Sequence, residues 1–248
     1  MTKPFTLLQL SDCHFLDDPT GLYKGHNPDG CLQALLPSCR RLAPDAVVWS
    51  GDLSETGSAA SYQRLVSMAA DLAPQQAWLP GNHDDASVME AVCSQAGWQR
   101  GPVFHWSGWR VVLLDSASAD NPCGQLNELR LRPLIDLHDG DENTPILVFI
   151  HHQPIAVEAA WIDRYGFADA SPLWQALSGL PVKVMGFGHV HQTYVGEHQG
   201  VACYSAPSTV ANSQAQTAEF VPDPTGPKGR WYRLWPDGRW LSGLISVG

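Results

Sequence analysis

Leu79-Pro80-Gly81-Asn82-His83-Asp84 is the stretch of this 248-residue sequence that most restricts the fold. Residues 77–79 form a short apolar run that reads as a strand, and the Gly and Asn after it favour a turn. In open α/β sheets, ligands bind just beyond the carboxyl ends of strands. A simple turn would explain this stretch by itself, so its meaning depends on the residues at the ends of the other apolar runs.

Four other apolar runs also end in side chains that can bind a metal ion. Phe5–Leu10 leads to Asp12-Cys13-His14, residues 46–49 lead to Ser50-Gly51-Asp52-Leu53, Ile146–Ile150 leads to His151-His152, and residues 182–185 lead to Gly188-His189-Val190-His191. Because each group follows a predicted strand, we expect all five groups to converge, although Asp12 and His191 stand near opposite ends of the chain. Gly51, Gly81 and Gly188 are expected to allow a close backbone approach there.

The alternation of apolar runs with amphipathic stretches is typical of an α/β protein. Trp109–Leu114 adds a strand, and further strand-like pieces fall at residues 193–197, 201–204, 231–235 and 239–245. Helical patterns fall at residues 30–42, 58–72, 87–96, 125–137 and 172–180, with Ser58 as the N-cap of the second. Residues 221–230, rich in Pro and Gly, predict an irregular loop. We expect one domain over residues 1–248.

Charge and composition exclude several classes of function. The net charge is -10, from 25 acidic and 15 basic residues, and the basic residues are scattered, which argues against a nucleic-acid or anionic-membrane surface. The sequence contains neither a signal peptide nor an apolar stretch of membrane-spanning length. The six cysteines form no CxxC pair and are expected to be reduced thiols, so a cytoplasmic location is predicted.

The side chains in the five groups indicate which metals they would bind. Carboxylates, a carboxamide and imidazoles suit Fe, Mn, Zn or Co, whereas thiolates are typical of structural zinc. A pair of ions needs a shared ligand, and a carboxylate has two oxygens with which to bridge them. Metal ions would also give an acidic protein the local positive charge that a small phosphate ester requires.

The motifs DxH, GD, GNHD, HH and GHxH, in this order, resemble those of the calcineurin-like metallophosphoesterase superfamily over nearly the whole chain. Four runs resemble, more narrowly, the bacterial class III 3',5'-cyclic-AMP phosphodiesterases: Leu7-Leu8-Gln9-Leu10-Ser11-Asp12, Leu79-Pro80-Gly81-Asn82-His83-Asp84, Val111-Val112-Leu113-Leu114-Asp115-Ser116 and Ser205-Ala206-Pro207-Ser208-Thr209. The resemblance implies a four-layer αββα sandwich, in which two mixed β-sheets pack face to face and helices flank both outer sides.

The resemblance also implies a ligand for every position of a dinuclear site, with Fe and Mn favoured. One ion would be held by Asp12, His14, Asp52 and His191, and the other by Asp52, Asn82, His151 and His189. Asp52 would bridge the ions together with a water or hydroxide. His151 is preferred to His152 because it is the first His after the strand, as in the family. His152 would then face the substrate or support a ligand.

In the mechanism that this site implies, a bridging hydroxide attacks phosphorus while both ions neutralise the phosphoryl oxygens. His83, beside Asn82, would contact the phosphoryl group or the leaving oxygen. Asp84 is expected to orient the His83 imidazole, as carboxylates commonly do. The three residues Asn82, His83 and Asp84 are therefore the predicted catalytic group.

The substrate is predicted to be a small-molecule phosphodiester, and cyclic AMP comes from the resemblance alone. A glycerophosphodiester, a nucleotide pyrophosphate and a phosphomonoester stay open, as does a non-catalytic binding protein with the same fold. The loops at residues 16–27, 120–125 and 156–170 are expected to distinguish the substrates. The ten Trp are expected in the core and at its edge, and the oligomeric state, with a homodimer among the alternatives, stays open.

Overall fold

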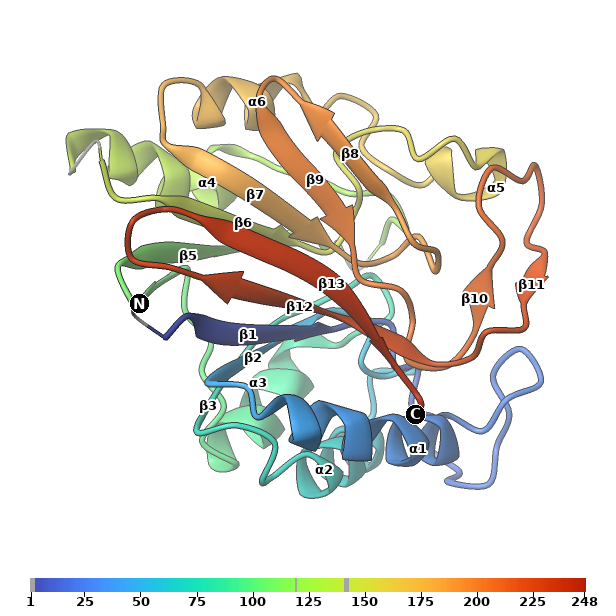
Figure 1. The fold of residues 1–248 in the computed structure, drawn as a ribbon. Coiled ribbons are helices and arrows are strands. Elements are labelled where there is room, and N and C mark those ends of the chain that lie inside the picture. Colours follow the sequence, from blue (N-terminus) through green and yellow to red (C-terminus); the bar gives the residue numbers. More distant parts are fainter. Residues whose placement is uncertain (1–2, 119, 141–142) are drawn as a thin grey trace.

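The computed structural model of the protein describes residues 3–118, 120–140 and 143–248. Two large β-sheets face each other (Figure 1). The first sheet has the order β13-β12-β1-β2-β3, with β1 at Phe5–Leu10, β2 at Ala46–Ser50, β3 at Gln75–Leu79, β12 at Lys228–Leu234 and β13 at Trp240–Ser246. Strands β1, β2 and β3 are parallel and β12 pairs with β1 antiparallel, so segments near both ends of the chain share this sheet.

The second sheet is also mixed. Its order is β4-β5-β6-β7-β9-β8, with β4 at Val103–Trp106, β5 at Trp109–Leu114, β6 at Ile146–Ile150, β7 at Val182–Phe187, β8 at Val195–His198 and β9 at Val201–Ser205. Strands β5, β6, β7 and β9 run parallel, while β4 and β8 pair antiparallel at the two edges. The short strands β10 (Asn212–Ser213) and β11 (Pro222–Asp223) form a separate hairpin.

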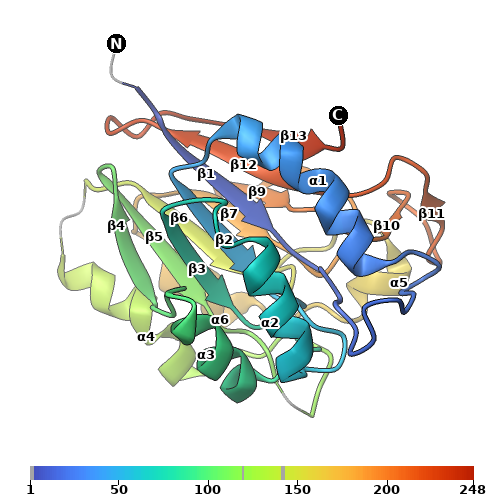
Figure 2. The ribbon, with the colours of Figure 1, turned by 90° about the horizontal axis from the view of Figure 1, so that it is seen from below.

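Helices cover both outer faces (Figures 1 and 2). Helices α1 (Pro28–Leu42), α2 (Ala59–Met68) and α3 (Ala86–Gln95) lie on the first sheet, while α4 (Glu128–Ile135), the 3₁₀ turn η1 (Asp136–Asp139) and α6 (Ser171–Leu177) lie on the second. The short helix α5 (Ala160–Asp163) lies beside the β10–β11 hairpin. As predicted, Ser58 caps α2 by accepting a hydrogen bond from the amide of Ser61. None of the helices within the described residues has the length and hydrophobicity needed to cross a membrane.

Successive side chains of a strand point to opposite faces of the sheet, so the apolar residues of these strands fall into three buried clusters. Val48 of β2 and Phe149 of β6 point between the sheets into a shared cluster. Their neighbours point outward, Trp49 into the cluster beneath α1–α3 and Val148 into the cluster beneath α4 and α6. Two outer clusters and a central one confirm the predicted four-layer αββα sandwich.

Pairing partners explain where the sequence interpretation was incomplete. The predicted irregular loop at residues 221–230 is partly wrong, because Pro222–Asp223 pairs with β10 and β12 begins at Lys228. Strand β4, which was not predicted, joins β5 through Ser107 and Gly108, whose φ values of 49° and 80° are those of a tight hairpin turn. Strands this short are stabilised by a partner strand, and the pattern of a single strand does not reveal that partner.

Gln9 provides a test of how the first sheet is held together. It is buried and donates to Ser50 Oγ (2.9 Å), while its Oε1 accepts from the Tyr232 hydroxyl (2.8 Å), so it connects β1 to β2 and β12. Tyr232→Phe leaves this buried acceptor unpaired, and we expect a loss of about 1–3 kcal/mol in the free energy of unfolding. Urea denaturation would measure it, with Tyr194→Phe, at a hydroxyl outside this network, as the control. Equal losses in the two variants would contradict the prediction.

Candidate metal centre

The polar groups at the ends of β1, β2, β3, β6 and β7 converge at one place, as predicted. Four triads have ligand atoms within 4.8 Å of one another: Asp12-His14-His191, Asp12-Asp52-His151, His14-Asp52-His83 and His151-His152-His189. The triads share members, so they form one cluster, and all of these residues except His83 are buried. Asn82 lines the same cavity as Asp52 and His189. The structure thus brings together all seven predicted ligands.

The backbone at these residues is unusual. Five of the seven predicted ligands have φ in the left-handed region, namely Asp12 (54°), His14 (45°), Asp52 (51°), His189 (67°) and His191 (47°). Such values cost residues with side chains about 1–2 kcal/mol each, and they persist only where the surrounding structure imposes them. In Asp12-x-His14 the alternate strained residues direct two side chains to one triad, whereas in His189-x-His191 they direct one side chain to each of two triads. Strain concentrated on one cluster of polar side chains indicates a functional site.

Close backbone packing requires glycine beside the cluster, as predicted. Gly51 has a φ of 94°, and a Cβ there would lie 2.5 Å from Nδ1 of His151. At Gly81 a Cβ would collide with the Asp52 carboxylate, and at Gly188 with the side chains of Ser11 and Asp12. The β-strands can therefore bring these ligands together only if no side chain stands at these positions.

The hydrogen bonds of His14 and His191 determine which ring nitrogens carry lone pairs. His14 donates from Nδ1 to Oε2 of Glu55 (2.6 Å), and His191 donates from Nδ1 to the carbonyl of Ala211 (2.8 Å). In the neutral rings both Nε2 atoms are then acceptors, yet they lie 3.0 Å apart. Nε2 of His191 also lies 3.3 Å from Oδ1 of Asp12. Three acceptors that face one another at these distances fit a shared cation.

His151 shows the same arrangement on the other side of the cluster. Its Nδ1 donates to the carbonyl of Ser50 (2.8 Å), so in the neutral ring Nε2 carries the lone pair, and this atom lies 3.3 Å from Oδ2 of Asp52. The same Oδ2 lies 3.9 Å from Nε2 of His14. Asp52 therefore stands between the two groups of imidazoles, where a bridging ligand must be.

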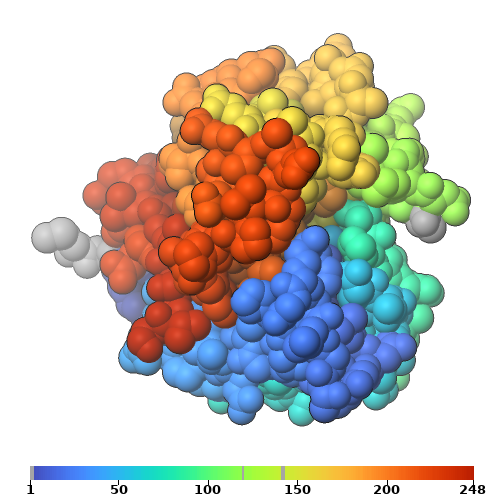
Figure 3. Space-filling model, turned by 90° about the vertical axis from the view of Figure 1, so that its right-hand side faces the viewer, coloured from blue at the N-terminus to red at the C-terminus, as the bar shows by residue number. Residues whose placement is uncertain are grey.

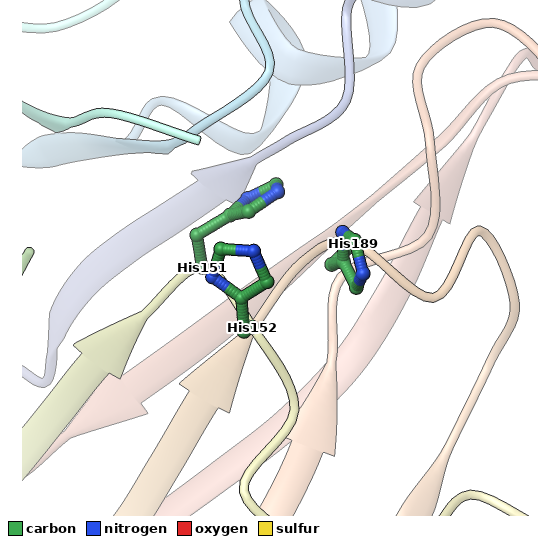
Figure 4. Close-up of side chains that lie close together, drawn as sticks. All are labelled: His151, His152 and His189. Atoms are coloured by element: carbon green, nitrogen blue, oxygen red, sulfur yellow. The ribbon is translucent and has the colours of Figure 1, made fainter. Parts of the chain in front are cut away.

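Both ring nitrogens of His152 make hydrogen bonds, whereas within the described chain only Nδ1 of His151 does. Its Nε2 donates to the carbonyl of Pro122 (3.1 Å), so Nδ1 accepts from the Ser116 hydroxyl (2.8 Å). Burial, together with the neighbouring His151, lowers the pKa of His152 to about 3, so the ring is neutral. Figure 4 shows the His151, His152 and His189 side chains close together beyond β6 and β7. The hydrogen bonds favour His151 over His152 as a ligand.

Buried polar atoms without partners test whether the site fits metal ions. Within the described residues, Oδ1 of Asn82, Nε2 of His151 and Nε2 of His189 are buried and have no hydrogen-bond partner. A buried unpaired acceptor costs about 1–3 kcal/mol, so three in one cluster require an explanation. All three are ligand atoms for borderline cations, and a divalent ion would satisfy each of them. The donor set therefore fits metal ions.

Glu55, which the sequence analysis did not identify, contacts two residues of the cluster. Its Oε2 lies 2.6 Å from Nδ1 of His14 and 3.3 Å from Nδ1 of His83. Burial lowers the pKa of His83, but the charges of Asp52 and Glu55 outweigh it, and the pKa is raised overall. The sequence signal that could have identified Glu55 is its position, three residues after Asp52 in the same loop.

Asp84 does not orient His83, so that prediction is wrong. Its carboxylate accepts hydrogen bonds from the amides of Leu53, Ser54 and Gly81 and from the Tyr62 hydroxyl. None of the contacts within the described chain links it to the His83 ring. Asp84 instead joins the loops after β2 and β3, which places Asp52 and Asn82 relative to each other.

The cluster opens into a cavity of about 270 Å³. Its lining is divided between the cluster residues and residues from three loops: Tyr23 and Lys24 from the first, Pro122 from the second, and Trp161, Ile162 and Tyr165 from the third. These are the loops at residues 16–27, 120–125 and 156–170, which the sequence analysis associated with substrate choice. The cavity confirms that all three border the site.

Comparison with known proteins identifies the family of this chain. Residues 5–193 match the model of the calcineurin-like phosphoesterase family. The chain belongs to the calcineurin-like phosphoesterases. A 3',5'-cyclic-nucleotide phosphodiesterase of Nostoc sp. is 30% identical to it over 247 residues, which are 98% of this chain and 93% of the relative. The 3',5'-cyclic adenosine monophosphate phosphodiesterase of Escherichia coli K12 is 31% identical over 237 residues, which are 94% and 86% of the two chains.

A solved structure agrees with the family fold. The purple acid phosphatase PPD1 of yellow lupin superposes with a TM-score of 0.63 at 12% identity, over 99% of this chain and 54% of the plant chain. At this identity the likeness concerns the fold alone. This calcineurin-like phosphoesterase is therefore an α/β enzyme of a family that uses metal ions to hydrolyse phosphoesters.

The contact between Glu55 and His14 generates a prediction for metal binding. Glu55→Gln keeps an oxygen acceptor but removes the charge that makes the imidazole a better ligand, so we expect affinity for Mn²⁺ to fall about 10- to 100-fold. Competition with a chromogenic chelator would measure it. Glu90→Gln, at an exposed Glu that pairs with Arg100 outside the cluster, is the matched control. Unchanged affinity in Glu55→Gln would contradict the prediction.

Proposed function

We propose that this calcineurin-like phosphoesterase is a dinuclear phosphodiesterase that hydrolyses 3',5'-cyclic AMP to 5'-AMP. The observation that carries the proposal is the cluster of imidazole and carboxylate acceptors whose free lone pairs face one another with Asp52 in the middle. The two bacterial relatives are named as cyclic-nucleotide and cyclic-AMP phosphodiesterases, which supports the substrate.

The proposed ligands divide into two sets that share Asp52. One set is Asp12, His14, Asp52 and His191, and the other is Asp52, Asn82, His151 and His189. Every donor is an oxygen or an imidazole nitrogen, which suits Fe, Mn, Zn or Co, and among these we favour Fe and Mn on the family resemblance. Cys13, which lies between two ligands, is buried in apolar surroundings that raise the pKa of its thiol, so it is not a thiolate ligand.

Two ions held here would supply an activated water and would neutralise the phosphoryl oxygens. His83, partly exposed at the cavity, carries a raised pKa and donates a proton or a hydrogen bond to the oxygen that leaves. Glu55 holds the His83 ring through Nδ1. The chain thus provides an acid on the open side of the cluster, opposite the buried ligands.

The rest of the protein suits a small anionic substrate. The net charge of -10 repels polyanions at long range, whereas the ions would give a positive field only inside the cavity. All six cysteines are free thiols, which supports the proposed cytoplasmic location.

Asp52→Asn tests the dinuclear site. It removes the bridging charge, so we expect the loss of at least one bound ion and a fall in turnover to background, measured by metal analysis and by hydrolysis of cyclic AMP with Mn²⁺ present. His83→Ala is the matched comparison, since it should keep both ions and slow turnover about 10²- to 10⁴-fold. Full activity of the metal-stripped protein would refute the mechanism.

A substrate panel tests the proposed reaction. Cyclic AMP, cyclic GMP, 2',3'-cyclic nucleotides, a glycerophosphodiester and a nucleotide pyrophosphate would be compared at equal concentration, with 4-nitrophenyl phosphate as the monoester. We expect the highest kcat/KM for a 3',5'-cyclic nucleotide. If another ester is hydrolysed and cyclic AMP is not, the proposed substrate is wrong while the metal site stands.

A further inference from the structure

The wall of the cavity opposite the ligand cluster is aromatic. Trp161 and Tyr165 line it from α5 and the turn after it, together with Tyr23 from the first loop. The amide of Tyr165 donates to the carbonyl of Ile162 (2.9 Å), so the turn after α5 holds Tyr165 close to the helix that carries Trp161. One cavity therefore combines the ligand cluster with an aromatic wall.

This aromatic wall is held in place. Trp161 and Tyr165 each pack one part of the ring against the buried cluster of the second sheet. The Asp163 carboxylate between them accepts from the amides of Val157 and Ala159, and the carbonyl of Ile162 accepts from Gln153 Nε2. These buried and paired contacts hold the helical turn, so the rings present a preformed surface to the cavity.

A third segment joins the wall from the β10–β11 hairpin. Phe220 packs edge-to-face on Trp161, with ring centroids 5.3 Å apart, and Nζ of Lys24 lies 4.5 Å above the Phe220 ring and 5.2 Å above the Tyr23 ring. Figure 3 shows the three segments adjoining on one face, in blue, gold and orange. Phe220 thus supports Trp161 and Lys24, which line the cavity, from a distant part of the sequence.

Tyr23 connects the aromatic wall directly to the ligand cluster. Its ring stacks on His14, with centroids 4.1 Å apart and an interplanar angle of 6°. A molecule that places a phosphate against the cluster and fills the rest of the cavity therefore contacts these rings. A glycerophosphodiester has nothing flat to place there, whereas a nucleobase has an aromatic face for stacking.

We propose that Trp161 and Tyr165 form a nucleobase-binding subsite that selects cyclic nucleotides over phosphodiesters without a base. The inference rests on the proposed function, because it assumes that the phosphate binds at the ligand cluster. In this assignment the cluster recognises the phosphate, and the aromatic wall determines which phosphodiester is bound productively.

The test compares substrates with and without a base in the Mn²⁺-loaded, full-length protein. The substrates are cyclic AMP and the 3',5'-cyclic phosphate of methyl ribofuranoside. Because stacking on one aromatic side chain changes binding by about 5- to 100-fold, we expect Trp161→Leu to reduce the ratio of their kcat/KM values by that factor. Trp161→Phe, which retains a ring, should lose less than Trp161→Leu.

Trp235→Leu is the matched control, because Trp235 lies in the turn between β12 and β13, at the other end of β1 from the cluster. Its ratio should stay at the wild-type value. If Trp161→Leu lowers kcat/KM for both substrates equally, or changes neither, the subsite is refuted, because a purely structural role would not alter the ratio.

A binding measurement separates this inference from the proposed function. Calorimetry would compare 5'-AMP with ribose 5-phosphate, and we expect 5'-AMP to bind at least about 10-fold more tightly in the wild type and to lose this advantage in Trp161→Leu. If that result appears without hydrolysis of cyclic AMP, the subsite stands and the proposed function fails. Equal affinities in the wild type would refute the subsite, whatever the turnover.

Discussion

Two carboxylates buried side by side, Asp12 and Asp52, are the constraint on which the rest of this structure depends. Their oxygens belong to one group within 4.8 Å, and neither residue is more than 2% exposed. Two negative charges at that distance repel by about 3–4 kcal/mol even at an effective dielectric constant near 20, apart from the cost of removing each from water. The surrounding imidazoles offset this repulsion only when they carry protons. Divalent ions would offset it with every imidazole neutral, because the Nδ1 hydrogen bonds then leave each Nε2 lone pair free for an ion.

The backbone strain results from the same constraint. Carboxylates and imidazoles on five separate loops can meet at one point only if those loops turn sharply directly after their strands. Left-handed φ values at five ligands and glycine at the points of closest approach are the local result. Asp84 and Gln9, which are not in the cluster, hold these loops and strands through buried hydrogen bonds. The three apolar clusters of the sandwich stabilise the strained segments, so the ligands are in place before any ion binds.

More of the candidate site than of the fold could be predicted from the sequence. The apolar runs revealed β1, β2, β6 and β7 because strands buried on both faces are continuously apolar, and the ligands come directly after the strand ends. Glu55 and the true role of Asp84 could not be predicted, since a single carboxylate beside a ligand gives no signal of which ring or amide it contacts. Strands β10 and β11, with two residues each, exist only through their pairing. The assignment of the sandwich came from family resemblance, and the single domain over residues 1–248 stays a prediction.

The expectation that the tryptophans lie in the core and at its edge describes two different situations in the structure. Trp49, Trp78 and Trp109 are buried, as expected of core residues. Trp161 lies at the boundary, because it packs on the core and also lines the cavity. Its loop pairs with no strand of either sheet in the described chain, but Val157, Ala159 and Ile162 of the same loop belong to the buried cluster of the second sheet. The same ligand cluster could serve different phosphoesters in different relatives, and under the proposed subsite substrate choice in this chain would depend on three loops whose sequence has no strand or helix pattern.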